Sequence, residues 1–439
     1  MSSEVNWTRL TLQQAGVSLI DCDRRTPPAA AEGFPYIAIP QLKDGHVDLS
    51  GARRIAPADY FEWTKKLKPR AHDVIVVRRC NSGDSAIVPV GLDCAIGQSL
   101  VVLRANGVAI EPTFLRWLVR GPHWWDQVAK FINVGAVFDS LRCRDIPNFE
   151  LTIPPLTVQR AISQVLGTLD DRIALLRETN ATLEAIALAL YKSWFVDFYP
   201  VRAKQQGLEP AGIDEATAAL FPDSFEESVF GMLPRGWRVE PVGQVVEGIY
   251  DGPHATPPEA GSGPVFLGIK NLTGSGLDLA EVRHFAEADF AQWTRRVEPQ
   301  AGDIVFSYEA TLGFFALIPP ALRCCLGRRL ALVRPRSGGA DGHFLFHQFV
   351  AAPFQRLLER HTIQGATVNR IALKQFPTYP VLNPPEGLKS RFDSVVAPLW
   401  ARTHENQAQA QTLGAFRDSL LPRLISGQLR LPEAAALAV

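Results

Sequence analysis

The feature that most constrains the fold is a long apolar repeat between Pro154 and Pro200. Apolar residues recur there at alternating spacings of four and three, which is typical of a helix that packs along a second helix. Pro154 and Pro155 mark its start, because proline fits the first helical turn but not the interior. A helix of roughly 38 residues is about 57 Å long and needs a partner to cover its seam. The seam comprises Ile162, Leu166, Leu169, Ile173, Leu176, Asn180, Leu183, Ala187, Leu190 and Trp194.

The chain also repeats itself at a constant offset, which is the separation of Trp7 from Trp237. The Thr-Pro-Pro triplets that begin at Thr26 and Thr256 are separated by the same offset. A single ungapped register that holds along the chain predicts a duplicated protein whose halves share one fold. The register also joins Asp73 to Asp303, Cys94 to Cys324, Gly97 to Gly327, Leu100 to Leu330 and Arg104 to Arg334.

The duplication predicts a second long helix after Pro385, and a weaker seam is visible there. Pro398 lies within its early turns, so we expect a break or kink at that point. The two helices can pair in antiparallel fashion if the repeats are related by a pseudo-two-fold axis. Asn180 at a seam position fits a role in fixing the register, although it could also face solvent where the seam is loose. The second seam comprises Phe392, Val396, Leu399, Thr403, Asn406, Ala410, Leu413, Arg417, Leu420 and Leu424.

Between the helices, each repeat contains short apolar runs of strand type, such as 73–77 and 303–306, punctuated by Gly, Pro and Asp. We therefore predict an α+β fold with two pseudo-symmetric globular domains, separated by two long helices that form an antiparallel coiled coil. The predicted segments are a first domain at 1–153, a first helix at 154–200, a connector at 201–235, a second domain at 236–383, a second helix at 384–427 and a tail at 428–439.

Composition limits the possible functions. Lys plus Arg equals Asp plus Glu, at 45 each, which argues against a strong general attraction for phosphate. The six cysteines show no paired CxxC spacing, so reduced thiols are expected and a zinc framework is not. No apolar run reaches membrane-spanning length, and the first residues lack the pattern of a signal peptide. We expect a cytoplasmic protein with no membrane partner.

Five motifs resemble those of the specificity subunits of type I restriction–modification enzymes. The resemblance covers nearly the whole chain and implies two target-recognition domains, each reading one half of a split DNA sequence, with the helices as a spacer. Val158 departs from the family, which has glutamate there, and the second copy at 383–389 has lost the glutamine. The motifs are Ile153-Pro154-Pro155-Leu156 with Gln159, Lys192-Ser193-Trp194-Phe195-Val196-Asp197-Phe198, Phe221-Pro222-Asp223-Ser224-Phe225, Leu233-Pro234-Arg235-Gly236-Trp237 and Leu421-Pro422-Arg423-Leu424-Ile425-Ser426-Gly427.

The resemblance also implies the partners. They are double-stranded DNA, two methyltransferase (modification) subunits and translocase–nuclease (restriction) subunits, with S-adenosylmethionine, ATP and Mg²⁺ on the partner subunits and no cofactor on this chain. An aromatic cluster at the end of the first helix has two interpretations, since such clusters mark both cores and interfaces. It either caps the helix against a domain or docks a partner subunit. Its members are Trp194, Phe195, Phe198 and Tyr199.

Catalytic motifs are absent from the sequence. Asn383-Pro384-Pro385-Glu386 resembles an adenine-methyltransferase motif, but Glu386 cannot stack on a flipped base. His343 and His347 are four residues apart without the glutamate of a zinc protease. No glycine-rich cofactor loop follows a strand. The sequence predicts no catalytic residue and no metal ligand.

Candidate base-reading residues lie where the repeats share a framework but differ in polar side chains. Each loop follows a strand, and we favour DNA contact for the loops as groups, although any one side chain can simply be solvated or can hold phosphate. In the first repeat the candidates are Arg24, Arg25, Thr26, Gln41, Lys43, Arg78, Arg79, Asn81 and Ser82. In the second they are His254, Thr256, Lys270, Asn271, Ser307, Tyr308, Glu309 and Thr311.

These observations favour a non-catalytic subunit that binds a gapped bipartite DNA site and positions methyltransferase and nuclease subunits on it. Three alternatives stay open: a specificity factor of a related phage-defence methylation system, a fused methyltransferase–nuclease enzyme, and a coiled-coil adaptor with no DNA role.

Overall fold

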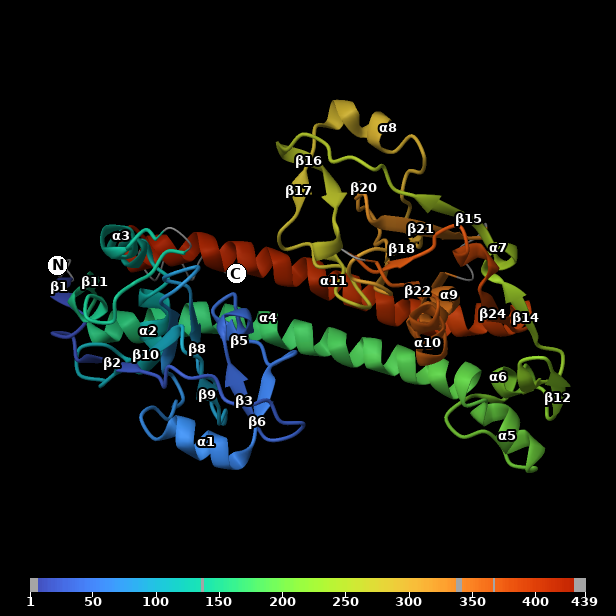
Figure 1. Ribbon diagram of the computed structural model, residues 1–439, viewed down its shortest axis with the longest axis horizontal. Helices are drawn as coiled ribbons and strands as arrows, with labels where there is room; N and C mark the ends of the chain where they lie inside the picture. The colour runs from blue at the N-terminus through green and yellow to red at the C-terminus, as the bar shows by residue number, and fades with distance from the viewer. Residues whose placement is uncertain (1–6, 136–137, 337–341, 366–367, 430–439) are drawn as a thin grey trace, which may run out of the picture. The chain divides into compact units, whose positions relative to one another are not determined.

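The computed structural model describes residues 7–135, 138–336, 342–365 and 368–429. The chain forms two compact units. The first unit comprises Met1–Ala174 and Thr412–Val439, and the second comprises Leu175–Gln411. Each unit contains one globular domain and a segment of both long helices, α4 and α11 (Figure 1). Most of the predicted tail, residues 430–439, lies outside the described residues.

The first unit is built around a six-stranded sheet of order β2-β10-β7-β8-β5-β4. Strand β7 is apolar throughout because both of its faces are covered. Val74 and Val76 join the core beneath α2 and α3, whereas Ile75 and Val77 join a separate core on the other face. A three-stranded sheet β6-β3-β9 and the pair β1-β11 complete the domain. The elements are β1 (Thr8–Thr11), β2 (Val17–Asp21), β3 (Phe34–Ile37), η1 (Ile39–Gln41), β4 (Leu42–Lys43), β5 (His46–Val47), β6 (Arg53–Ile55), α1 (Pro57–Thr64), β7 (Val74–Val77), β8 (Ser85–Ile87), β9 (Ala95–Ile96), β10 (Leu100–Ala105), α2 (Pro112–Leu118), α3 (Pro122–Phe131), η2 (Ile146–Asn148) and β11 (Glu150–Ile153).

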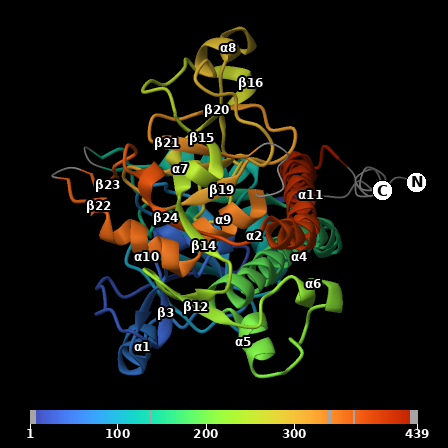
Figure 2. The ribbon, with the colours of Figure 1, turned by 90° about the vertical axis from the view of Figure 1, so that its right-hand side faces the viewer.

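The second unit has a four-stranded sheet of order β15-β21-β18-β19 and a three-stranded sheet β17-β16-β20. Helix α9 packs against β19 and β21 (Figure 2). The predicted connector is itself folded, as two short helices and a β-hairpin. The elements are α5 (Tyr199–Gln205), α6 (Glu215–Ala219), β12 (Phe225–Ser228), β13 (Gly231–Pro234), β14 (Arg238–Pro241), α7 (Val242–Val245), β15 (Val246–Asp251), β16 (Ala260–Leu267), η4 (Ile269–Asn271), β17 (Arg283–His284), η5 (Glu287–Asp289), α8 (Phe290–Trp293), β18 (Ile304–Ser307), β19 (Phe315–Leu317), β20 (Cys324–Leu326), β21 (Leu330–Pro335), α9 (Gly342–Val350), α10 (Ala352–Arg360), β22 (Thr362–Ile363), β23 (Arg370–Ile371), η6 (Phe376–Thr378) and β24 (Pro380–Asn383).

The two domains share the same strand register, residue for residue. Tyr36 pairs with Ala95 in the parallel strands β3 and β9, and their counterparts in the second repeat, Phe266 and Cys325, pair in β16 and β20. The repeat offset also relates two buried ion pairs, Arg104 with Asp73 and Arg334 with Asp303, each with an N–O distance of 2.6 Å. The prediction of a duplicated protein with two α+β domains is confirmed.

Both predicted long helices are present. Helix α4 spans Leu156–Tyr191 and continues in a π-helical turn at Lys192–Val196, while α11 spans Glu386–Ile425. Nearly all of the predicted seam residues are at least half-buried. The break expected at Pro398 is absent, and α11 continues through it. Pro398 is exposed, so water can satisfy the carbonyl that loses its N–H partner.

The helices pair in antiparallel fashion within the second unit. Asn180 Nδ2 donates to the Thr403 carbonyl at 3.0 Å, and Asn406 Nδ2 donates to Asn180 Oδ1 at 2.8 Å. Further along α4 the Tyr191 ring contacts Phe392, which lies earlier in α11. The prediction that Asn180 occupies a seam position is confirmed, and its role in fixing the register stays a prediction.

Candidate nucleic-acid interface

In the first unit, the three predicted loops converge on a turn between β9 and β10. Cys22 Sγ donates to the Gly97 carbonyl at 3.1 Å, and the Gly97 amide donates to the Ile37 carbonyl at 2.7 Å. The Arg78 amide donates to the Ser99 carbonyl at 3.0 Å. The turn therefore holds the starts of all three loops at one edge of the domain. The loops are residues 22–26, 38–43 and 78–83, and the turn is residues 97–99.

A cavity of about 370 Å³ opens where these segments meet. Burial raises the pKa of the Tyr36 phenol, so this group remains a neutral hydrogen-bond donor at the wall of the cavity. Half of the residues that line the cavity are polar, and only one of them, Arg53, carries a formal charge. Such a lining suits a ligand with donor and acceptor edges. The polar lining residues are Thr26, Tyr36, Gln41, Arg53, Gln98 and Ser99.

The second unit builds the same junction around residues 327–329. The Gly252 amide donates to the Leu330 carbonyl at 3.0 Å, and the Tyr308 amide donates to the Arg329 carbonyl at 3.2 Å. At Gly327 an added Cβ would lie 2.5 Å from the Leu267 carbonyl oxygen, so this close approach requires glycine. The two domains thus present one framework with different side chains.

Most of the predicted DNA-contacting residues of the first unit are exposed, and two of its arginines are positioned by contacts with neighbouring side chains. Arg25 forms a hydrogen bond with Asp23 at 2.7 Å and lies over the Trp63 ring at 4.8 Å. Arg79 lies over the Phe138 ring at 5.7 Å. The other exposed candidates of the chain are Arg24, Thr26, Lys43, Asn81, His254, Thr256 and Lys270, with Glu309 and Thr311 partly exposed.

Six of the residues that were predicted to contact DNA are instead buried. Asn271 Oδ1 accepts from the Gly268 amide at 2.9 Å, and its Nδ2 donates to the Asp278 carbonyl at 3.0 Å, so its hydrogen-bonding groups serve the protein itself. Tyr308 donates to Asp251 Oδ1 at 2.9 Å. Asn271 and Tyr308 thus hold their loops in shape, and the prediction of base contact rests on the exposed members. The buried residues are Gln41, Arg78, Ser82, Asn271, Ser307 and Tyr308.

Sequence reasoning missed the central turn itself. It carries Gln98 and Ser99 in the first unit, whereas the equivalent residues of the second unit are Arg328 and Arg329. Arg328 is exposed, and Arg329 is half-buried beside Glu309, with an N–O distance of 3.9 Å. The sequence does contain a signal for this turn. The two repeats share a Cys-x-x-Gly-x-x-Leu pattern that begins at Cys94 and Cys324, and they differ at the two residues after its glycine.

The aromatic cluster at the end of α4 mostly belongs to a core. Trp194 and Phe195 are each 3% exposed and pack against Phe392 of α11. Phe198 contacts Trp237, whereas Tyr199 is 41% exposed. The packing interpretation therefore holds for Trp194 and Phe195, and only Tyr199 offers much free surface.

The helix segments of the first unit are joined by a buried charge network. Asp170 on α4 pairs with Arg417 on α11 at 2.5 Å and also with Arg116 on α2. Burial alone would raise the pKa of Asp170, but hydrogen bonds from His46 and Arg417 and the charge of Arg116 lower it well below its usual range. The carboxylate is thus held ionised between two guanidinium groups.

The equivalent site of the second unit is aromatic. Trp400 takes the place of Asp170, and Ala187 takes the place of Arg417. His347 is 1% exposed, and burial lowers its pKa to about 3. Its Nδ1 donates to the His343 carbonyl at 2.7 Å, while Nε2 accepts from Trp400 Nε1 at 3.5 Å. His347 therefore packs as a neutral core residue.

Comparison with known proteins finds one consistent similarity. A family model described as "Type I restriction modification DNA specificity domain" matches residues 22–185. The MjaIX specificity subunit of Methanocaldococcus jannaschii is 24% identical over 390 residues, which cover 87% of this chain and 83% of the relative. The HindI specificity subunit of Haemophilus influenzae is 23% identical over 383 residues, covering 76% and 81%. Residues 22–185 thus match a type I restriction–modification DNA specificity domain, and most of the chain is similar to proteins named type I specificity subunits.

The fold agrees with this assignment. The crystal structure of a type I restriction–modification S subunit from M. genitalium superposes with a TM-score of 0.52, at 15% identity and with 97% of both chains covered. The matched segment 22–185 contains the first central turn, its three loops and most of α4. The family model describes a DNA specificity domain, and both relatives are named specificity subunits. Within the described residues there is no cluster of three metal-binding side chains and no helix long and apolar enough to cross a bilayer.

Proposed function

We propose that this specificity subunit binds a gapped bipartite DNA site, with each domain reading one half. The observation that carries the proposal is the repeated junction, in which one backbone framework presents Gln98 and Ser99 in one domain and Arg328 and Arg329 in the other. Glutamine can pair with an adenine edge and arginine with a guanine edge in the major groove. Different side chains on one framework suit two different half-sites.

The long helices serve as the spacer in this proposal. Helix α4 has 36 residues and runs through both units, so it is about 54 Å long. A B-DNA turn measures about 34 Å, so this helix is longer than one turn of DNA. In the proposal, the uncontacted gap in the site corresponds to the helical spacer.

The proposed partners are two methyltransferase subunits and the translocase–nuclease subunits, which would carry S-adenosylmethionine, ATP and Mg²⁺. The balanced charge of this chain, with 45 basic and 45 acidic residues, provides little general attraction for DNA. Tight binding would therefore depend on the partners to complete a clamp around the duplex. We expect the complex to act in the cytoplasm, where it would meet genomic DNA.

A genome-wide map of adenine methylation, in cells with and without this chain, tests the proposal. We expect one gapped motif to disappear when the chain is removed. Replacing residues 236–379 with the equivalent domain of another specificity subunit should change only one half of that motif. A change in both halves, or an unchanged map, would refute the division of labour between the domains.

A further inference from the structure

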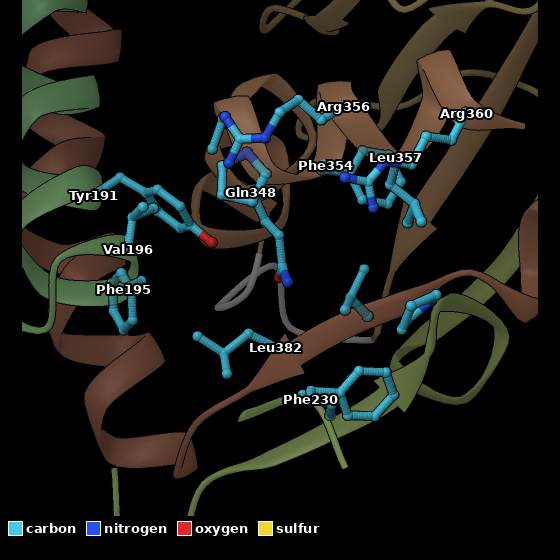
Figure 3. Close-up of a pocket in the computed structure, with 15 residues that line it drawn as sticks. Tyr191, Phe195, Val196, Phe230, Gln348, Phe354, Arg356, Leu357, Arg360 and Leu382 are labelled. Carbon is cyan, nitrogen blue, oxygen red and sulfur yellow. The ribbon is translucent and has the colours of Figure 1, made fainter. Parts of the chain in front are cut away.

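A second cavity of about 370 Å³ lies within the second unit, between α10, β24 and the end of α4 (Figure 3). Its walls are largely apolar and include Tyr191, Phe354 and Leu382. Phe230, in the turn of the β12–β13 hairpin, lines it while being 57% exposed. Large apolar side chains left uncovered beside an open cavity are typical of a binding surface.

Gln348 supplies a polar group inside this cavity. The residue is 6% exposed, and its buried Oε1 has no hydrogen-bond partner among the residues that the structure describes. The side chain extends from α9 toward the space bounded by Tyr191, Leu382 and Phe230 (Figure 3). A buried acceptor without a donor is costly, so a bound N–H group would be stabilising. A carboxamide can accept from an N–H and donate to a C=O, which matches a peptide backbone.

Two arginines add charge at the rim. Arg356 and Arg360 lie four residues apart on α10, line the cavity and are exposed. Residues at this spacing share one face of a helix. Neither guanidinium forms an ion pair with any residue in the described part of the chain. The rim therefore favours a ligand that carries carboxylates.

The first domain differs at two of the three equivalent positions and keeps a basic residue at the third. The repeat register matches Leu118, Asp126 and Lys130 to Gln348, Arg356 and Arg360, respectively. Leu118 is buried in a core, and the charges of Asp126 and Lys130 cancel. Because the shared fold forms without the Gln348 carboxamide and the Arg356 guanidinium, their presence in the second domain points to a ligand.

We propose that this cavity docks an acidic peptide segment with one apolar anchor residue, supplied by a methyltransferase subunit. This inference rests on the proposed function. The anchor would fill the space between Phe230 and Phe354, the backbone would pair with Gln348, and carboxylates would engage Arg356 and Arg360. A DNA backbone would satisfy only the arginines and would leave the apolar walls exposed to water.

The test measures the affinity between the full-length chain and the methyltransferase subunit in solution. The double variant Arg356→Glu, Arg360→Glu should weaken binding by about tenfold or more, and less so at high salt. Gln348→Leu, which installs the first domain's residue, should also weaken binding. The matched control is Lys130→Glu on α3 of the first domain, which should bind like the unmodified chain. A photocrosslinker at Leu357 should label an acidic stretch of the methyltransferase subunit.

Equal affinities for the double variant and the Lys130→Glu control would overturn the docking site, and so would crosslinks from Leu357 to DNA alone. In both cases the proposed function would stand, because the unmodified chain would still assemble and direct methylation. If the unmodified chain neither bound the methyltransferase subunit nor directed methylation, both proposals would fail together.

Discussion

The buried charge network of the first unit allows a quantitative prediction. Asp170 and Arg417 have side chains that are each 2% exposed, and Arg116 is 13% exposed. Asp170→Asn preserves side-chain size but removes the buried negative charge that lies between the two guanidinium groups. Removing one partner of a buried ion pair typically costs about 3–5 kcal/mol, because the remaining charge is left uncompensated. The uncompensated charge here would be that of Arg116, since Arg417 keeps its ion pairs with Asp44 and Asp418.

Hydrogen exchange followed by mass spectrometry measures this loss within the intact chain. A loss of that size corresponds to exchange that is faster by about two to almost four orders of magnitude. The acceleration is expected in peptides over β7 and β10, while the equivalent strands β18 and β21 serve as the internal control. Exchange that changed by less than tenfold, or changed equally in both units, would refute the reasoning.

A second variant separates charge from packing. The triple replacement Arg116→Met, Asp170→Leu, Arg417→Met removes all three charges and keeps apolar volume in the site. Replacement of a buried ionic group by apolar residues of similar size is often neutral or stabilising. We therefore expect the triple variant to be more protected than Asp170→Asn. The opposite order would show that the site depends on hydrogen-bond geometry and not on charge balance.

Three further predictions follow from other sites. Because burial lowers the folded-state pKa of His347 to about 3, its contribution to stability is full above about pH 6.5 and declines as the pH falls toward 3. Acidification from pH 7 to 5 should destabilise the second unit by about 2 kcal/mol more in the unmodified chain than in His347→Leu, as measured by urea unfolding. Asn180→Leu should destabilise the second unit by about 1–3 kcal/mol because Asn406 loses its partner, and adding Asn406→Leu should restore stability in the same assay. In gel shifts with the assembled complex, Arg328→Ala should weaken specific DNA binding by about 1–3 kcal/mol and should reduce sequence specificity in only one half-site. Reduced specificity in both half-sites would exclude a base contact confined to one half.

The architecture was largely predictable because it rests on periodicity and repetition. Heptad spacing located both helices, and the constant offset between the repeats located two domains of one fold. The continuity of α11 through Pro398 was not predictable. It depends on that residue facing solvent, which the helix alone does not determine. Local helix rules gave way there to packing of residues such as Phe392 and Val396, which are fully buried.

The candidate interface was predictable at the level of loops but not of side chains. Loops that follow buried strands must emerge at the sheet edge, and this placed 22–26 and 78–83 correctly. Whether a polar residue faces out depends on local hydrogen bonds, as Asn271 and Tyr308 show. Turn 97–99 differs between the repeats in sequence, but its central position follows only from contacts with residues far away in the sequence, such as Cys22.

The differing chemistry at the helix junctions bears on how such a chain can evolve. Asp170 faces Arg417 in the first unit, whereas the matching positions of the second unit hold Trp400 and Ala187. A self-pairing copy of the first half would set Asp170 against alanine, and a self-pairing copy of the second half would set Trp400 against arginine. Each half of the chain is therefore matched to the helix of the other half at this junction, and a self-pairing copy of either half would lose that match.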